Sequence, residues 1–354
     1  MKTLDRYLGR TFMHSWLGVN LVLAGLFSFL ELARQLDDVG KGSYSITDAI
    51  LYVVLTLPGR MMEMAPPSAL IGSIIALGLL NKNLELMAMW AGGISIQRIG
   101  LSFMKPAVLT LIILLLGAQF IIPSLEQTAW TLRETSVSES GTILPRGGFW
   151  TRHEKRFINL RTSRDKGTQA VDIYEFDDKR RLDDYISAGE TEIGTDGKWT
   201  LRDVRHTVLT DKGSSKSEMP KLVLSNLLTS RQAAQLALPP QTLSLSELYS
   251  IIKNLKNRAQ NPGRYQLTLW QKLCLPVMTA AMIMLSLPFV CGLARRGSLG
   301  LQILFGAITG VGFFYLNQIL GYSGLIIQVS PFFSTLLPAL LVLGGGAFLT
   351  KKAM

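Results

Sequence analysis

The chain has 354 residues, of which 48% are apolar and only 17% are charged, and its mean hydropathy is +0.29. Soluble domains usually carry about 25% charged residues, so this composition is typical of a membrane protein. The formal net charge is +11, and most charged residues lie between Arg133 and Arg264. This uneven distribution predicts a soluble domain inserted into a membrane protein.

The N-terminal part, residues 1–130, predicts a short basic interfacial helix followed by three membrane spans. Residues 46–80 are too long for one simple span and too short for two, so we expect an outer arm over 46–57 and a kink at Pro66-Pro67. The expected spans cover residues 12–32, 61–80 and 101–122.

From about residue 131 the pattern changes to short segments in which polar and apolar residues alternate. These segments are RFINLRT, AVDIYEF, KWTLRDVRHTVLT and PKLVLSNL. Turn signals such as Thr195-Asp196-Gly197 separate them, which is typical of an all-β sandwich or barrel. A helix over residues 245–258 is expected to lead back to the membrane, so the inserted domain covers residues 131–258.

The C-terminal part, residues 259–354, predicts three further spans over residues 269–293, 299–320 and 326–349. The fifth span contains Gly306 and Gly310 at G-x-x-x-G spacing, and Gly312 follows. Small residues let helices approach closely in lipid. These glycines therefore predict close packing, either within this chain or against another subunit.

Basic residues in the short loops and at the termini indicate the orientation, because cytoplasmic loops carry an excess of Lys and Arg. We therefore expect both termini and residues 81–93 in the cytoplasm, and the β domain outside it. The basic residues on the expected cytoplasmic side are Lys2, Arg6, Arg10, Lys82, Arg98, Lys105, Arg295, Arg296, Lys351 and Lys352.

Motifs for the common catalytic sites are missing from the sequence. It has no G-x-x-x-x-G-K-[ST] phosphate loop and no G-x-S-x-G turn, and the motif that starts at His153-Glu154 has Phe157 in place of the second histidine. We therefore expect no active site and no metal. A transporter coupled to an ion gradient is an alternative, although Glu31, Glu63 and the other charges lie toward the outer ends of the expected spans.

Residues 81–93 predict a short helix that has an apolar face and a carboxylate beside it. Leu84, Met87 and Ala91 share this face, Glu85 and Met89 lie beside it, and Gly92 ends the helix. A helix resting on the anionic inner leaflet should be basic, whereas a central Glu suits a groove on a protein partner. The alternative is a surface helix whose Glu is solvated.

At this point the sequence resembles the LptF/LptG family, the permeases of the ABC transporter that exports lipopolysaccharide in Gram-negative bacteria. The resemblance is to the LptG members, and the LptF members, which share the layout, are the alternative. The matching stretches are Leu4-Asp5-Arg6-Tyr7-Leu8-Gly9, Gly42-Ser43-Tyr44, Glu85-Leu86, Ala91-Gly92-Gly93-Ile94-Ser95, Gly263-Arg264-Tyr265-Gln266-Leu267, Trp270, Lys272, Gln318-Ile319 and Gly321.

The resemblance implies six inner-membrane helices, an inserted periplasmic β-jellyroll, and a role in lipopolysaccharide transport. The Glu85 helix would be the coupling helix, seated in the ATPase LptB. That partner would bind ATP and Mg, so this chain itself would need no cofactor. Lipopolysaccharide would enter between gates formed by the first and fifth spans and pass to LptC, with LptF as second permease. We expect no nucleic acid partner.

The resemblance also implies a cluster of cations near the outer membrane surface, where they would bind the phosphates of lipopolysaccharide. The alternative is that they are interfacial anchors or partners of nearby carboxylates. Glu31, Asp37 and Asp38 are acidic where we expect basic residues in the family. The candidate cations are Arg34, Lys41, Arg60, Arg133 and Lys272.

Two readings outside this family stay open. One is a secondary transporter with a periplasmic binding domain, and the other is an envelope scaffold that transports nothing. An ATPase partner and independence from the proton gradient would separate the permease from the secondary transporter. A scaffold would stimulate no ATPase activity.

Overall fold

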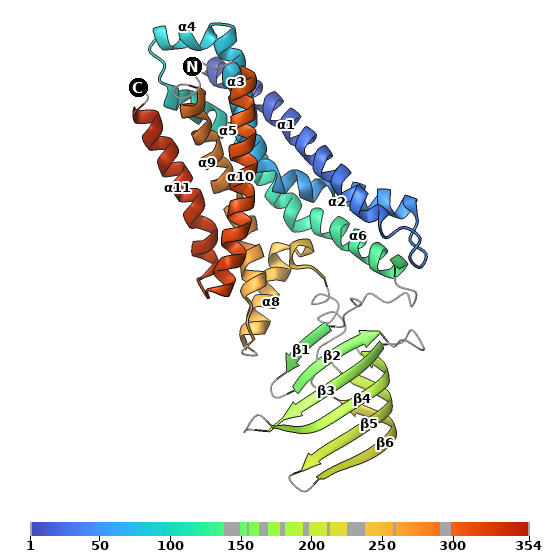
Figure 1. Cartoon of the computed structure of the whole chain (residues 1–354). Helices are drawn as coiled ribbons and strands as arrows, with labels where there is room; N and C mark the ends of the chain where they lie inside the picture. The colour runs from blue at the N-terminus through green and yellow to red at the C-terminus, as the bar shows by residue number, and fades with distance from the viewer. Residues whose placement is uncertain are drawn as a thin grey trace.

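The computed structural model describes residues 2–137, 149–153, 156–162, 169–177, 181–193, 198–210, 213–224, 238–257, 260–290 and 299–352. Figure 1 shows a long helical region with a curved β-sheet at one end, while both chain termini lie at the opposite end. The predicted turn over residues 195–197 and the basic pair Arg295-Arg296 lie outside the described residues.

The first helix, α1 (Lys2–Leu36), joins the predicted interfacial helix and the first span into one continuous helix. Its sequence contains no proline, so no backbone N–H is missing along its length. Phe12 and Trp16 on its inner face are buried and stack on each other, and Phe12 also stacks on Phe103 of the third span.

The second crossing is broken rather than kinked. Helices α2 (Ile46–Glu63) and α3 (Ala65–Lys82) meet at Met64 with a bend of 64°. Pro66 and Pro67 lie in the first turn of α3, where helical N–H groups have no partner in any case, so the chain starts a new helix there. The break therefore precedes the proline pair, whereas the sequence predicted a kink at it.

The sequence predicted all of the remaining α-helices except the one over Ile122–Val137. Their bounds are α4 (Glu85–Ala91), α5 (Ile96–Phe120), α6 (Ile122–Val137), α8 (Leu245–Asn257), α9 (Gly263–Pro288), α10 (Leu299–Ile326) and α11 (Pro331–Lys352). Among the described residues, four helices are long and apolar enough to cross a membrane, and the α2–α3 pair could form a fifth span. A shorter apolar stretch covers Pro331–Gly346 of α11. The molecule is therefore a helical membrane protein, and the count of six spans stays a prediction.

The boundary predicted at residue 131 falls inside α6. After Pro123 the sequence up to Val137 contains no glycine or proline, and Ala129 and Val137 are buried, so the helix continues beyond the third span. The inserted β segment begins only after α6 has ended.

The insert is an antiparallel sheet of six strands in the order β1-β2-β3-β4-β5-β6. A jellyroll needs the crossovers of two Greek keys, whereas the described strands form a simple meander, so the jellyroll stays a prediction. The strands are β1 (Phe149–His153), β2 (Arg156–Thr162), β3 (Gln169–Phe176), β4 (Leu182–Ile193), β5 (Trp199–Thr210) and β6 (Gly213–Leu224).

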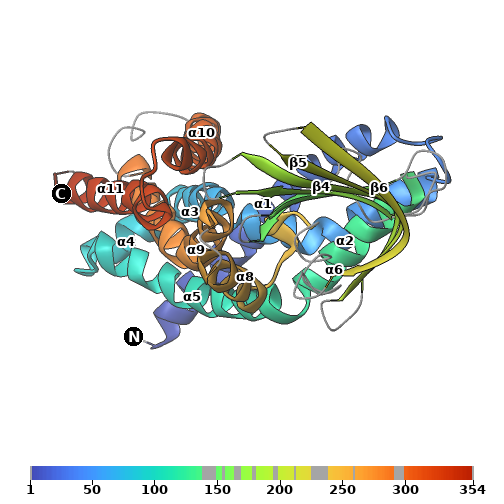
Figure 2. The same cartoon turned by 90° about the horizontal axis from the view of Figure 1, so that it is seen from below.

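Each part of the molecule has its own core. In the sheet, alternate side chains of the central strands form a cluster around Trp199, which is fully buried. In the helical region, α3 is almost entirely buried, and Figure 2 shows it with α9 among the other helices. α1 approaches α3 closely at Gly72, where an added Cβ would lie 2.7 Å from the Cα of Trp16.

Candidate functional site

Helix α4 lies at the end of the helical region that carries both termini, far from the sheet (Figure 1). Leu86 faces inward with 1% of its surface exposed, and Met89 packs in part against the main core. Leu84 and Met87 are 68% and 52% exposed. The structure therefore splits the predicted apolar face, because Met89 contributes to the core while Leu84 and Met87 point outward.

Glu85 at the start of α4 is held by two neighbours. Its Oε2 accepts a hydrogen bond from the hydroxyl of Tyr7 at 2.7 Å, and its Oε1 accepts one from Asn83 Nδ2 at 3.3 Å. Leu84 before it has a left-handed backbone with φ of 61°. An ionised carboxylate has about four lone-pair sites, so Glu85 keeps acceptor capacity for a further donor.

The C-terminal end of α4 is also exposed. Gly92 caps the helix through its N–H, which donates to the carbonyl of Ala88 at 3.0 Å, and Gly93 has a φ of +81° that suits glycine. Ala91, Gly92 and Gly93 are all exposed. Leu84, Met87 and Ala91 thus form an exposed apolar strip beside the Glu85 carboxylate, which we call the α4 strip.

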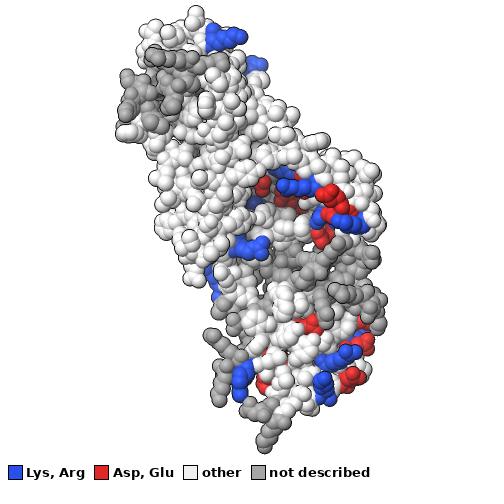
Figure 3. Space-filling model, viewed as in Figure 1, with Lys and Arg blue, Asp and Glu red and all other residues white. Residues whose placement is uncertain are grey.

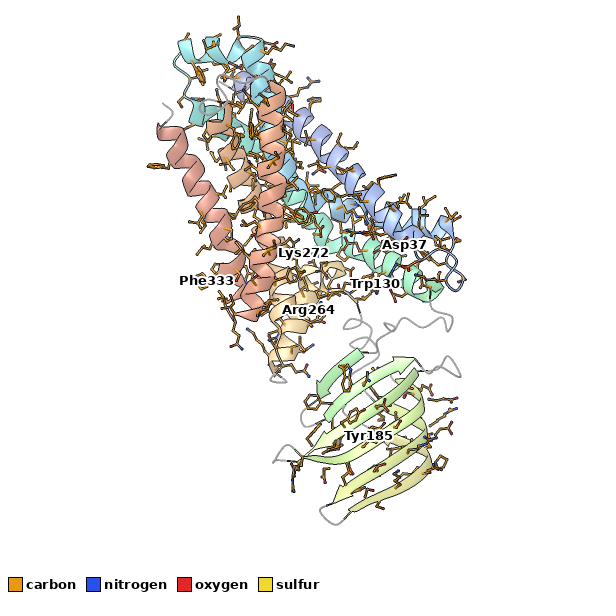
Figure 4. The ribbon with its side chains drawn as sticks, in the orientation of Figure 1. Asp37, Trp130, Tyr185, Arg264, Lys272 and Phe333 are labelled. Carbon is orange, nitrogen blue, oxygen red and sulfur yellow. The ribbon has the colours of Figure 1, made fainter. Side chains whose placement is uncertain are left out.

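The second candidate site lies at the other end of the helical region, next to the sheet. Figure 3 shows acidic and basic side chains gathered side by side there, below a largely uncharged helical surface. Figure 4 places Lys272, Trp130 and Asp37 at this level, on α9, on α6 and just after α1. The structure therefore brings segments from both halves of the membrane region to this end.

Arg133 is the most firmly held of the candidate cations. It donates to Gln35 Oε1 at 2.9 Å and to Glu134 Oε1 at 2.8 Å, and it also pairs with Asp38. Its guanidinium lies 5.9 Å from the ring centre of Trp130. Asp38 in turn accepts from Lys41 at 2.6 Å. Hydrogen bonds from Lys41 and Arg133 hold the pKa of Asp38 below its ordinary value.

Two of the three acidic residues that depart from the family expectation, Glu31 and Asp38, are the partners of these cations. Glu31 lies 3.7 Å from Arg34 and 4.0 Å from Arg60, and Asp38 pairs with both Lys41 and Arg133. Arg60 also has a buried nitrogen, Nη1, that makes no hydrogen bond. Four of the five candidate cations are therefore paired with a carboxylate of the same chain.

Lys272 differs from the other cations because it binds backbone. Its Nζ donates to the carbonyl of Gln241 at 2.8 Å and to that of Leu243 at 2.7 Å. These carbonyls belong to the 3-10 helix η1 (Pro240–Thr242) and the residue after it, which lead from the sheet into α8. An ammonium group has three donors, so one remains for a further acceptor.

The glycines of α10 separate into two groups. An added Cβ at Gly306 would lie 2.4 Å from Ile74, and one at Gly310 would lie 3.3 Å from the carbonyl oxygen of Pro67. Gly312 has no neighbour within 4 Å. Gly306 and Gly310 therefore pack within this chain against α3, and Gly312 faces open space.

Several residues of these sites were given no role at a site from the sequence. Tyr7 was placed in the expected interfacial helix and in a stretch that matches the family, and Gln35 has no charge that would single it out. Glu126 lies on α6 and packs against Gly59, but the break at Pro123 concealed the helix that carries it. Among the described residues, no group of three or more metal-binding side chains occurs.

Comparison with known proteins agrees with this layout. The family described as "Lipopolysaccharide export system permease LptF/LptG" matches residues 6–352. The chain is 31% identical over 344 residues to the lipopolysaccharide export system permease protein LptG of Haemophilus influenzae, covering 96% of both chains. It is 30% identical over 339 residues to the protein of that name in Escherichia coli K12, covering 95% of this chain and 94% of the relative.

The family match spans both helical parts and the inserted sheet, so it includes Glu85 and the charged residues next to the sheet. We call these the outer charge cluster, and its members are Glu31, Arg34, Asp38, Lys41, Arg60, Arg133, Glu134 and Lys272. The chain therefore belongs to the LptF/LptG family of lipopolysaccharide export system permeases.

Proposed function

We propose that this chain is the LptG-type permease subunit of an ABC transporter in the inner membrane. With LptF it would enclose a cavity that takes lipopolysaccharide from the outer leaflet and passes it through LptC toward the outer membrane. The two similar proteins named above are both called LptG, which favours this subunit over LptF. Six spans, cytoplasmic termini and a periplasmic jellyroll belong to the same proposal.

The observation that carries the proposal is the exposure of the α4 strip. A seven-residue helix at the tip of a membrane region leaves Leu84 and Met87 largely exposed beside a carboxylate. Apolar side chains that surround an acceptor suit a groove on a protein that offers a cationic or N–H donor. We assign this groove to the ATPase LptB, which would bind ATP and Mg and perform the hydrolysis.

The outer charge cluster supports the assignment of the cargo. Lipid A offers acyl chains and phosphates, and the candidate cations lie on four helices and in the turn after α1, namely Arg34, Arg60, Arg133, Lys272 and Lys41. The arginine guanidinium can donate two parallel hydrogen bonds to a phosphate, and it can donate the same pair to a carboxylate. We therefore propose that Glu31 and Asp38 hold the arginines in the empty transporter and give way to lipid A phosphates.

The experiment that tests the proposal is a co-purification of the chain with its candidate partners, using a tag after Met354. We expect an ATPase subunit to accompany the native chain and to be lost or weakened with Glu85→Ala. The control is Lys82→Ala, because Lys82 is an exposed charged neighbour at the end of α3. Retention with Lys82→Ala and loss with Glu85→Ala would support the assignment of Glu85.

Absence of any ATPase from the native complex would contradict the proposal. The secondary transporter and the scaffold would then have to be considered again. Transport in vesicles that follows a proton gradient rather than ATP would favour the secondary transporter. Absence of both transport and ATPase stimulation would favour the scaffold.

A further inference from the structure

The first two turns of α1 contact α4 and α5 at the same time. Tyr7 donates its hydroxyl to Glu85 Oε2 at 2.7 Å. Asp5 accepts from Ser102 Oγ at 2.8 Å and from Lys105 Nζ at 2.6 Å. The start of α1 is therefore fixed to α4, which carries the α4 strip, and to the helix that follows it.

The Tyr7–Glu85 contact is well suited to transmit a displacement. It joins residues 78 positions apart in the sequence and involves a hydroxyl donor and an ionisable carboxylate. Charge-assisted hydrogen bonds of this type are roughly twice as strong as bonds between neutral groups. Because Glu85 is also the proposed docking residue, a partner that pulls on it also pulls on α1.

The helix beyond Tyr7 forms a continuous rod. α1 has 35 residues and no proline, and at 1.5 Å per residue it extends about 52 Å. The crossing formed by α2 and α3 is instead bent by 64°, and α5 contains Pro106. Unlike these two crossings, α1 is neither broken nor interrupted by a proline.

The far end of α1 is fixed to the outer charge cluster. Gln35 is 5% exposed, and its Oε1 accepts from Arg133 Nε at 2.9 Å and from the hydroxyl of Tyr44 at 3.1 Å. Gln35 Nε2 donates to Glu31, which pairs with Arg34 and Arg60. A shift of α1 along its axis would therefore move the groups that hold these arginines.

We infer that Tyr7 is a positioning residue that joins Glu85 to α1, and that α1 carries the displacement of α4 to the outer charge cluster as one rigid helix. This inference rests on the proposed function, because it presumes an ATPase at the α4 strip and phosphate binding at the cluster. It assigns a mechanical role to a residue that would contact neither ATP nor the cargo.

The test uses the complete complex in liposomes that contain lipopolysaccharide. We would measure ATP hydrolysis and ATP-dependent release of lipopolysaccharide, and calculate the amount of lipopolysaccharide released per ATP hydrolysed. Tyr7→Phe keeps the ring and removes the hydroxyl, so we expect this ratio to fall several-fold while the complex still assembles. Tyr249→Phe is the matched control, because Tyr249 on α8 is 65% exposed and lies outside this path.

A second variant changes the middle of α1 and leaves the contacts at both ends of the helix unchanged. Val22 is 67% exposed, and Val22→Pro should kink α1 between Tyr7 and Gln35. We expect it to lower the same ratio. A native ratio in an assembled Tyr7→Phe complex would overturn the inference and leave the proposed function intact. If the native complex contains no ATPase, the proposed function fails and the inference fails with it.

Discussion

At the residue scale, the candidate phosphate-binding cations differ in how firmly carboxylates of the same chain hold them. The Arg34 side chain is 80% exposed and its nearest carboxylate lies 3.7 Å away. The Arg133 side chain is 22% exposed and has Asp38, Glu134 and Gln35 as partners. A lipid phosphate would therefore have to displace Asp38 from Arg133, whereas Arg34 is nearly free to bind it.

This competition predicts the effect of Asp38→Asn. Removal of the charge would free Lys41 and Arg133, so we expect lipopolysaccharide to bind several-fold more tightly at neutral pH, as measured by retention of labelled lipopolysaccharide on the purified complex. Hydrogen bonds from Lys41 and Arg133 lower the pKa of Asp38. The Asp38 carboxylate therefore stabilises the fold fully when the pH is above its ordinary pKa of about 3.9. This stabilisation is lost as the pH falls through the lowered pKa of the folded state.

The matched control is Asp37→Asn, the same substitution at an exposed neighbour. The gain in affinity should also shrink as pH falls through the pKa of Asp38, because the native side chain then loses its charge as well. Equal gains in the two variants would instead indicate a general effect of net charge, and a loss of affinity with Asp38→Asn alone would contradict the competition.

The kinds of residue in the outer charge cluster could be predicted from the sequence, but their partners could not. Arg34, Lys41 and Arg60 became candidates because the family resemblance implies cations near the outer membrane surface, where the expected topology places these residues. The contact between Asp38 and Arg133 joins residues 95 positions apart, and it depends on α6 continuing past the third span. Such a pairing follows from the packing of helices, which no local pattern specifies.

At the scale of elements, the packing of α10 on α3 predicts different effects for Gly310 and Gly312, which are two residues apart. Gly310→Leu would push a side chain into the backbone of Pro67, and overpacking of this kind costs about 1–3 kcal/mol. We expect a lower midpoint of thermal unfolding for Gly310→Leu and a near-native one for Gly312→Leu. The measurement is thermal unfolding of the purified chain in detergent.

The Gly312→Leu variant also tests the alternative that the glycines of α10 pack against another subunit. If Gly312→Leu leaves the midpoint unchanged but weakens recovery of the second permease, then the open side of α10 contacts that subunit. An equally large fall of the midpoint in both variants would contradict the assignment of Gly310 alone to packing against α3.

Helices and strands in which apolar residues recur with a regular period were predicted well. Elements in which that pattern is interrupted, or which begin at a break in a helix, were not. The helix over residues 245–258 corresponds to α8, and the segments RFINLRT and AVDIYEF lie within β2 and β3. β4 was missed because Asp183, Asp184 and Gly189 interrupt its apolar pattern. The bend at Met64 was predicted two residues too late, at Pro66-Pro67, because a proline pair fits the start of a helix as well as a kink inside one.

At the scale of the whole molecule, the inserted sheet is connected to the helical region by a segment that several helices hold. Lys272 of α9 donates to the carbonyls of Gln241 and Leu243, and Gln127 of α6 donates to that of Thr242 at 3.2 Å. Movement between the halves of the membrane region would therefore reach this segment directly. On the proposed path of the cargo, Lys272 would lie where lipopolysaccharide leaves the helices for the sheet.

Lys272→Met distinguishes a structural role for this lysine from phosphate binding. Hydrogen bonds to a charged group contribute about 1.5–3 kcal/mol, so we expect roughly tenfold or faster hydrogen exchange over residues 238–244. Lys256→Met is the control, because Lys256 is an exposed lysine in the last turn of α8. Mass spectrometry of the exchanged complex measures the effect without any need for transport.

Two readouts together decide what Lys272 does. Faster exchange with unchanged binding of lipopolysaccharide means that Lys272 holds the sheet connection only. Faster exchange with weaker binding means that its third donor also reaches a phosphate, which ties the cargo to the segment that carries the sheet. Weaker binding with native exchange would contradict the prediction, because the two carbonyl contacts would then contribute nothing to the order of this segment.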